Sequence, residues 1–206
     1  MTPILVGLGL SAAAGLNAYI PLLLLGLVAR YGELLPLPES WQWLESPVML
    51  GVLGVLLLLE LVADKVPGVD TVNDLVQTVV RPTSGGITFG AGASAATVDG
   101  TPESGSLGPV VAGVLVALAL HGVKSLARPA LNTLTLGTAG VVVSTVEDAA
   151  SLTLTLVALL IPILIVVAVP VLVLLAVWAV RRGRTGRRRS RRGRGGGAGE
   201  SPNTAA

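Results

Sequence analysis

The uncharged apolar stretch of residues 152–180 does most to limit the possible folds of the chain. A straight α-helix of these twenty-nine residues would be about 43 Å long, whereas the hydrocarbon core of a bilayer is about 30 Å thick. The helix must tilt, bend or begin outside the lipid. Pro162 and Pro170 are the expected bending points, because proline removes a backbone donor and clashes with the preceding turn. Trp178 stands at interfacial depth and arginines follow from Arg181, so the stretch predicts a membrane span with a cytoplasmic C-terminal end.

The composition supports a membrane protein. Hydrophobic residues make up 52% of the 206 positions and charged residues only 13%, against about 25% charged residues in soluble domains. Aromatic residues are scarce, which argues against a β-barrel with aromatic girdles. The absence of cysteine excludes disulfides and thiolate metal sites. No histidine-rich, phosphate-cradling or dinucleotide-binding motif is present, so we expect neither a metal nor a cofactor.

Three further apolar stretches, residues 3–29, 47–63 and 109–123, are predicted to be membrane spans. The first resembles a signal peptide, but no basic residue precedes it and its apolar run resumes, which favours a retained helix. Residues 85–98 and 133–146 are rich in small residues and short for a full span, so each is expected to be a short buried helix or a re-entrant element. The predicted fold class is therefore all-α: a polytopic integral membrane helical bundle of four spans and two short Gly/Ala-rich segments.

The charge distribution favours six membrane segments. Residues 1–180 hold five basic and eleven acidic residues, a net charge of −6, whereas residues 181–206 hold nine arginines and one glutamate, a net charge of +8. Six segments place the tail on one side of the membrane together with four basic residues of the domain, Lys65, Arg81, Lys124 and Arg128. The other side then receives the acidic residues of 31–46, 99–106 and 147–148.

Because basic residues are enriched in cytoplasmic loops, the positive-inside rule assigns the basic side to the cytoplasm. We therefore expect a membrane-embedded domain of residues 1–180 in the cell membrane, with both termini in the cytoplasm. Residues 181–206 are expected to form a disordered basic tail.

The tail determines which partners are expected besides the lipid bilayer. Its basic residues, between Arg181 and Arg194, would attract anionic lipid head groups by about 1 kcal/mol each near the surface. Non-specific contact with nucleic acid is a second interpretation, but a topology anchor with a disordered linker is the simpler one. We expect no specific nucleic-acid partner, and a homo-oligomer is left open.

A short pattern occurs twice at an offset of 47 residues. Arg81-Pro82 is followed by residues 88–90 (TFG), and Arg128-Pro129 by residues 135–137 (TLG). Internal duplication is common in transporter folds, where binding sites lie between the repeats. The alternative is that Arg-Pro ends a helix twice by chance.

Three motifs carry a family resemblance. They are residues 9–19 (GLSAAAGLNAY), residues 60–70 (ELVADKVPGVD), and a third run from Arg128-Pro129 through Asn132 to Glu147-Asp148. Over residues 5–180 the chain resembles a family of small bacterial membrane proteins catalogued as domain of unknown function 4126. The resemblance implies a compact helical membrane domain and no assigned reaction.

Ionisable residues at the ends of predicted spans are the main candidates for a site. A charge in a membrane helix costs on the order of 2.5–3.5 kcal/mol on insertion scales, so it usually faces a partner or water. Glu60 and Asp64 are four residues apart and hence on one helix face, with Lys65 adjacent.

A second, basic set follows the predicted span 109–123. Lys124 and Arg128 share a helix face, and His121 lies three residues before Lys124. Opposite charges at matched depth predict cross-helix pairs, such as Glu60 with Lys124 or Asp64 with Arg128. These residues either form a polar site at the inner side of the bundle or serve as structural ion pairs and snorkelling helix ends.

Two asparagines complete the candidate substrate- or ion-binding set. Asn17 lies in the middle of the first predicted span, next to Gly15, where the helix could unwind or pack closely. Its amide would hydrogen-bond across helices or coordinate an ion. Asn132 is included as a member of the third motif.

Other polar residues and prolines are expected to have structural roles. Pro67 begins a turn, and Asp70 is expected to cap the helix that follows. The spacing of Asp70, Asn73 and Asp74 does not match a calcium-binding EF-hand loop. The remaining structural candidates are Pro82, Pro129, Glu147 and Asp148.

Three classes of function remain, in decreasing order of support. The first is a small transporter or channel for an ion or small polar solute, and the second is a non-transporting membrane scaffold or lipid-interacting protein. An enzyme is the weakest alternative. Ser94 and His121 faintly resemble the dyad of rhomboid-type intramembrane proteases, but the second glycine of that motif is missing. We therefore expect no enzymatic activity.

Overall fold

The computed structural model describes residues 2–32, 35–63, 69–96, 107–134, 139–175, 177–178 and 181. Every regular element in this part of the chain is a helix. In chain order they are α1 (Thr2–Leu16), α2 (Tyr19–Tyr31), η1 (Glu39–Glu45), α3 (Pro47–Ala63), α4 (Val69–Ala95), α5 (Leu107–Leu134), α6 (Ala139–Leu160) and η2 (Pro162–Leu164). Helical backbone then continues from η2 to Leu175. The all-α prediction is confirmed.

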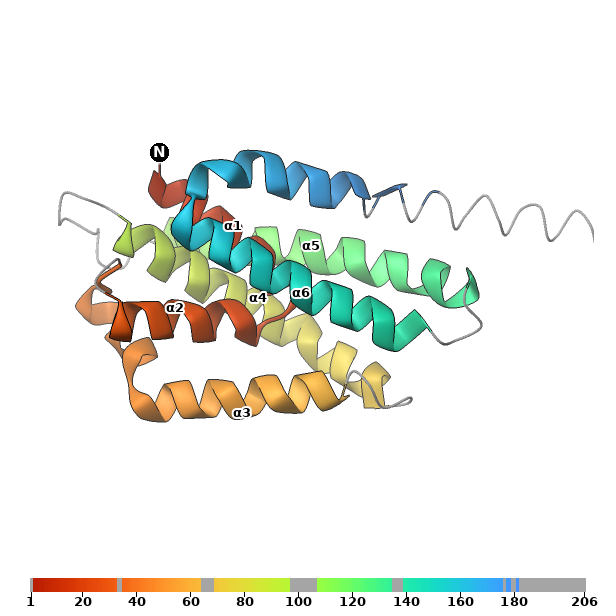
Figure 1. The fold of residues 1–206 in the computed structure, drawn as a ribbon, viewed down its shortest axis with the longest axis horizontal. Coiled ribbons are helices and arrows are strands. Elements are labelled where there is room, and N and C mark those ends of the chain that lie inside the picture. The colour runs from red at the N-terminus through yellow and green to blue at the C-terminus, as the bar shows by residue number, and fades with distance from the viewer. Residues whose placement is uncertain are drawn as a thin grey trace, which may run out of the picture.

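The long helices α4, α5 and α6 run side by side and alternate in direction, as Figure 1 shows. Helix α1 lies among them: side-chain contacts join it to α4 at Gly7 and Phe89, to α5 at Gly15 and Leu120, and to α6 at Gly9. Helices α2 and α3 cover one side of this group. The helix that follows η2 lies along the opposite side (Figure 1).

The predicted span 3–29 is not one helix but a hairpin of two short helices. Asn17 and Ala18 interrupt it, and α2 returns toward the end of the bundle where α1 begins (Figure 1). The cause lies in Pro21, which has no N–H to offer the carbonyl of Asn17 and whose ring crowds that carbonyl. We call α1 and α2 together the N-terminal hairpin.

Contacts along the chain confirm the direction of each arm of the N-terminal hairpin. The start of α1 packs against the end of α4, because Gly7 lies against Phe89. The far end of α2 reaches the same level, since Gly26 lies against Leu44 of η1, and Trp41 of η1 lies against Gly90. The tip at Asn17 is therefore deep in the bundle, and both outer ends lie at one end of it.

Close packing of α4 on α5 depends on two facing glycines. A Cβ added to Gly113 would collide with the carbonyl oxygen of Gly85, and one added to Gly85 would meet the carbonyl oxygen of Gly113 at 2.7 Å. Small residues at such crossings let helix backbones approach closely, as is usual in membrane bundles. The crossing fixes the depth at which the polar residues of α4 face those of α5.

The two short predicted segments belong to longer helices. Residues 85–95 are the second half of α4, which continues through Pro82. Of residues 133–146, the last eight belong to α6. The predicted single span 152–180 is wrong. Helix α6 ends at Leu160, and the chain turns back at Pro162, the first of the two predicted bending points. At the second, Pro170, the helical backbone continues.

Both pairs of the repeated Arg-Pro pattern lie inside helices. Arg81-Pro82 lies inside α4, which runs opposite to the preceding apolar helix α3 (Figure 1). Arg128-Pro129 lies inside α5, in the same helix as its apolar span. Neither Arg-Pro pair ends a helix, so the alternative of two chance helix ends is wrong, and internal duplication stays a prediction.

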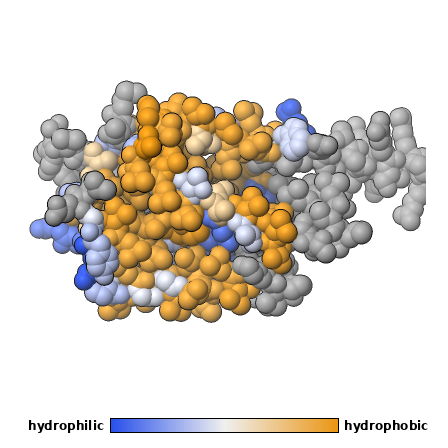
Figure 2. Space-filling model, viewed as in Figure 1, coloured by the Kyte–Doolittle hydropathy of each residue, from blue (hydrophilic) through white to orange (hydrophobic). Residues whose placement is uncertain are grey.

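The outer surface of the bundle is apolar. Figure 2 shows hydrophobic residues over most of one face, and exposed Val, Leu and Ile side chains occur on α3, α5, α6 and the last helix. Among the described residues, two stretches are long and apolar enough to cross a bilayer, Leu107–Ser125 and Val141–Leu160. Helix α3 with η1, bent by 59° between them, gives a third if the pair is counted as one span. These helices indicate a membrane protein.

The glycine crossing generates a test with a matched control in the same helix. Gly113→Ala should lower the free energy of unfolding by about 1–3 kcal/mol, because its Cβ meets backbone that cannot move aside. Gly122→Ala should be neutral or stabilise the protein by up to about 1 kcal/mol, since a Cβ there meets nothing within 4 Å and alanine favours helix. Thermal unfolding in detergent measures both, and equal melting temperatures for the two variants would contradict the crossing.

Candidate functional site

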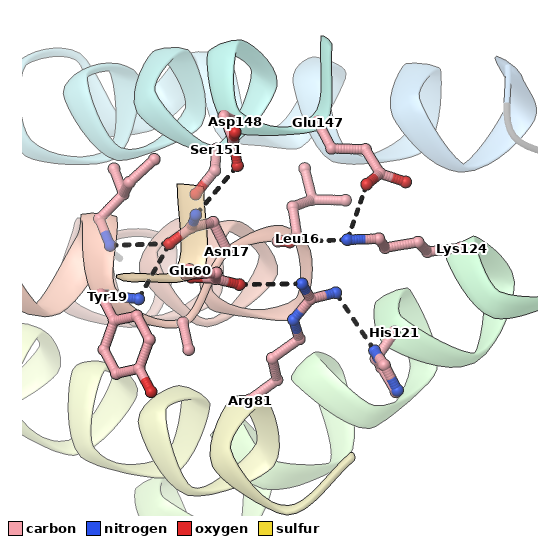
Figure 3. A network of polar contacts seen from close by, with 12 residues as sticks. Leu16, Asn17, Tyr19, Glu60, Arg81, His121, Lys124, Glu147, Asp148 and Ser151 are labelled. Carbon is pink, nitrogen blue, oxygen red and sulfur yellow. Dashed lines mark hydrogen bonds and ion pairs between the residues drawn. The ribbon is translucent and has the colours of Figure 1, made fainter. Parts of the chain in front are cut away.

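Buried polar side chains gather where the tip of the N-terminal hairpin meets α3, α4, α5 and α6 (Figure 3). Most of them are at most 7% exposed, and Glu147 and Asp148 are partly buried. Charged residues inside a membrane bundle are costly, so a group of them requires a structural or functional reason. We call the group the buried polar layer; its members are Asn17, Glu60, Gln77, Arg81, His121, Lys124, Glu147, Asp148 and Ser151.

Asn17 holds the tip of the hairpin in place. Its side-chain oxygen accepts hydrogen bonds from the backbone N–H groups of Tyr19 at 3.0 Å and Ile20 at 3.1 Å, which caps the first turn of α2. Its Nδ2 donates to Oδ1 of Asp148 on α6 at 2.9 Å. The amide therefore both caps a helix and hydrogen-bonds across the bundle.

Three carbonyl groups around the break between α1 and α2 accept hydrogen bonds from side chains of three different helices. Ser151 of α6 donates to the carbonyl of Ala13 at 2.9 Å, Lys124 of α5 to that of Leu16 at 3.3 Å, and Ser84 of α4 to that of Ala18. The Ala13 carbonyl also accepts the backbone N–H of Asn17 at 3.0 Å. The Leu16 carbonyl loses its helical donor at the break, because the N–H of Ile20 donates to the Asn17 side chain instead, and the Lys124 side chain supplies the donor. The break is thus anchored on all sides.

The first buried ion pair joins α3 to α4. Arg81 and Glu60 are 3.0 Å apart, and each side chain is 1% exposed. A second guanidinium nitrogen of Arg81 lies 3.4 Å from Nδ1 of His121, whose Nε2 lies 3.4 Å from the Thr78 hydroxyl. Because a guanidinium only donates, Nδ1 is the accepting nitrogen of the imidazole and Nε2 carries the proton.

The second ion pair joins α5 to α6. Nζ of Lys124 lies 2.7 Å from Oε2 of Glu147, with side-chain exposures of 4% and 14%. The same ammonium reaches the carbonyl of Leu16 at the tip of α1. Lys124 therefore connects three helices at the hairpin tip, as Figure 3 shows.

The observed pairs differ from the predicted ones. Glu60 is bonded to Arg81, not to Lys124, because residues 69–95 form one helix that brings Arg81 against α3. Glu147 and Asp148 were expected on the opposite side of the membrane from Lys124, which is wrong: Glu147 contacts Lys124 directly. Helix α6 begins at Ala139, so both acids lie about two turns inside it.

The structure does not describe the side chains of most of the remaining predicted site residues. Asp64, Lys65 and Pro67 lie outside the described residues. The predicted Asp64–Arg128 pair is therefore not tested by the structure. The side chains of Asp70, Arg128, Pro129 and Asn132 are also outside the described part, although all four lie within helical backbone. Asp70 is in the first turn of α4, which begins at Val69. Ser94, the weak nucleophile candidate, is near the end of α4, thirteen residues beyond the ion-paired Arg81.

Sequence reasoning missed several members of the layer. Arg81 enters the sequence-based predictions through topology and the repeated Arg-Pro pattern but not as a site residue. Gln77 and Ser151 of the layer are not singled out, and neither is Ser84, which donates to the carbonyl of Ala18. A signal for α4 was present: Gln77, Arg81, Ser84 and Thr88 are spaced by four, three and four residues, which places them on one helix face. Because residues 85–98 are predicted as a separate segment, these four residues are not assigned to one helix.

The Glu60–Arg81 pair generates a stability prediction. Glu60→Gln should lower the free energy of unfolding by about 3–5 kcal/mol, because it leaves the Arg81 charge buried without its carboxylate. The double variant Glu60→Met/Arg81→Met should recover most of that loss, since an apolar pair of similar volume avoids the charge. Thermal unfolding in detergent is the measurement, with Thr83→Val, an exposed position on α4, as the control. A single variant as stable as the parent would contradict the pairing.

Comparison with known proteins gives a family but no characterised relative. No curated protein and no solved structure matches the chain. One family model, described as domain of unknown function (DUF4126), matches residues 4–182 and includes the three motifs that suggested the resemblance. The chain therefore belongs to this family of unknown function.

Proposed function

We propose that this protein moves an ion or a small polar solute across the cell membrane by way of the buried polar layer. The observation that carries the proposal is the broken N-terminal hairpin, whose tip meets charged residues from four other helices. Discontinuous helices that meet at polar residues deep in a bundle are typical of transporter sites, because helix ends and unwound backbone bind charged or polar groups.

The same hairpin defines the membrane arrangement that we propose. Helices α3 to α6 and the last helix cross the bilayer, and the N-terminal hairpin enters and leaves on one side. Figure 1 supports this, since α1 begins and α2 ends at one end of the bundle, whereas the last helix runs toward the other end. With the arginines from Arg181 onward in the cytoplasm, the N-terminus lies outside. We place the protein in the inner membrane of a bacterium, as the family resemblance implies.

A non-transporting scaffold is the second candidate function, and one observation favours it. The charges of the buried polar layer contact each other: Glu60 bonds to Arg81 and Lys124 to Glu147. Such pairs specify which helices pack together without any solute. A scaffold would keep its function when a pair is replaced by apolar residues. A transporter would lose polar residues of the layer along which the ion or solute moves.

Transport can be tested with a variant that separates the two functions. Glu60→Met/Arg81→Met removes a complete pair and leaves no lone buried charge, so we expect it to fold but to reduce flux at least about tenfold. Flux of protons, potassium, sodium and glycerol is measured in proteoliposomes with indicator dyes and light scattering. Thr153→Val, at an exposed position on α6, is the control. Equal flux in the parent, the double variant and the control for every solute would overturn the proposal.

The membrane arrangement has its own test. The chain has no cysteine, so single cysteines report position without background. In right-side-out vesicles, a membrane-impermeant maleimide should label Thr2→Cys without permeabilisation and Arg181→Cys only after it. Labelling of both positions from the same side would contradict the re-entrant hairpin.

A further inference from the structure

The ammonium of Lys124 occupies the position that a bound metal cation would take in a broken-helix site. It lies 2.7 Å from a carboxylate oxygen of Glu147 and 3.3 Å from the carbonyl oxygen of Leu16. Carboxylate and backbone carbonyl oxygens are the ligands that hard monovalent and divalent cations use in proteins. The Lys124 side chain is 4% exposed, so this set of oxygens is inside the bundle.

The backbone at this point is negative for a second reason. Leu16 is the last residue of α1, and the C-terminal end of a helix carries roughly half a negative charge. Unwound backbone and C-terminal helix ends at the core of a transporter coordinate sodium or protons for this reason. The neighbouring carbonyls of Ala13 and Ala18 accept hydrogen bonds from neutral hydroxyl groups, those of Ser151 and Ser84. Of these three carbonyls, only that of Leu16 accepts a hydrogen bond from a cation, the Lys124 ammonium.

The charged surroundings on every side are consistent with a cation site. Helix α6 contributes Glu147 and, one residue on, Asp148, which holds Asn17 at the tip. On the side of α3 and α4, the positive charge of Arg81 is opposed by the carboxylate of Glu60. Glu147 of α6 is thus the anionic partner at the hairpin tip, and the ammonium of Lys124 serves as its cation.

We propose that the oxygens around the Lys124 ammonium form a monovalent-cation site at the hairpin tip, which K⁺ or Na⁺ occupies when the ammonium leaves. Lys124 is then a tethered competitor of the free ion. K⁺ fits with the least rearrangement, because its radius is close to that of an ammonium group. The inference rests on the proposed function for the ion's movement across the membrane, but binding at the site is measured without transport.

The test replaces the tethered cation by a neutral side chain of similar length. Lys124→Met and the parent, both full-length and in detergent, are melted in choline chloride, NaCl and KCl at about 100 mM. We expect the parent to melt at one temperature in all three salts. Lys124→Met should melt at least about 3 °C higher in KCl or NaCl than in choline chloride, with a saturable dependence on the metal ion, because the ion binds only the folded state.

A matched double variant shows whether Glu147 provides the ligand. Lys124→Met/Glu147→Gln removes both charges of the ion pair and should show the same melting temperature in every salt. If Lys124→Met does not fold in choline chloride, its recovery as a monodisperse protein in KCl or NaCl supports the site. Equal melting in all salts, or recovery in none of them, overturns it.

Transport and cation binding can fail separately. A saturable effect of K⁺ or Na⁺ on Lys124→Met, with no flux of any solute in the parent, would overturn the proposed function and leave the cation site standing. Flux in the parent with no salt effect on Lys124→Met would do the reverse.

Discussion

A helix that stops inside a bilayer must find hydrogen-bond partners for its last carbonyls, and this requirement organises the centre of the molecule. Pro21 favours the break at Asn17, because it leaves the carbonyl of Asn17 without a helical donor, and the Asn17 side chain caps the first turn of α2. Side chains from α4, α5 and α6 then close around the end of α1. Lipid cannot supply such donors, so polar side chains of three helices lie around the break.

The ion pairs follow from that arrangement. Lys124 cannot reach the carbonyl of Leu16 as an unpaired charge in a dry bundle, and Glu147 on the facing helix balances it. Arg81 is balanced by Glu60 in the same way and links α3 to the rest. Stability and the proposed function thus involve the same residues, which is why replacing a complete pair is more informative than removing one charge.

The apolar surface and the polar layer place opposite demands on the sequence. Val and Leu on the outside require lipid, whereas the layer requires that water or ions reach the centre in a controlled way if the protein transports. The close crossing of α4 and α5 at Gly85 and Gly113 affects the polar layer directly. It holds the two helices that carry Arg81, His121 and Lys124 in a fixed register.

The sequence by itself determined the class of protein, because long uncharged stretches and a low charge content leave no soluble alternative. It also determined helix α3, whose predicted bounds are those observed, and it singled out Asn17, Glu60, His121 and Lys124, which lie together in the buried polar layer. Only the tertiary structure decided which charges meet. Partners such as Glu60 with Arg81, or Lys124 with Glu147, are twenty or more residues apart, and their contact depends on helix ends at Asn17, Ala139 and Pro162. Hydropathy does not locate such ends, because a break in a membrane helix keeps the same apolar composition on both sides.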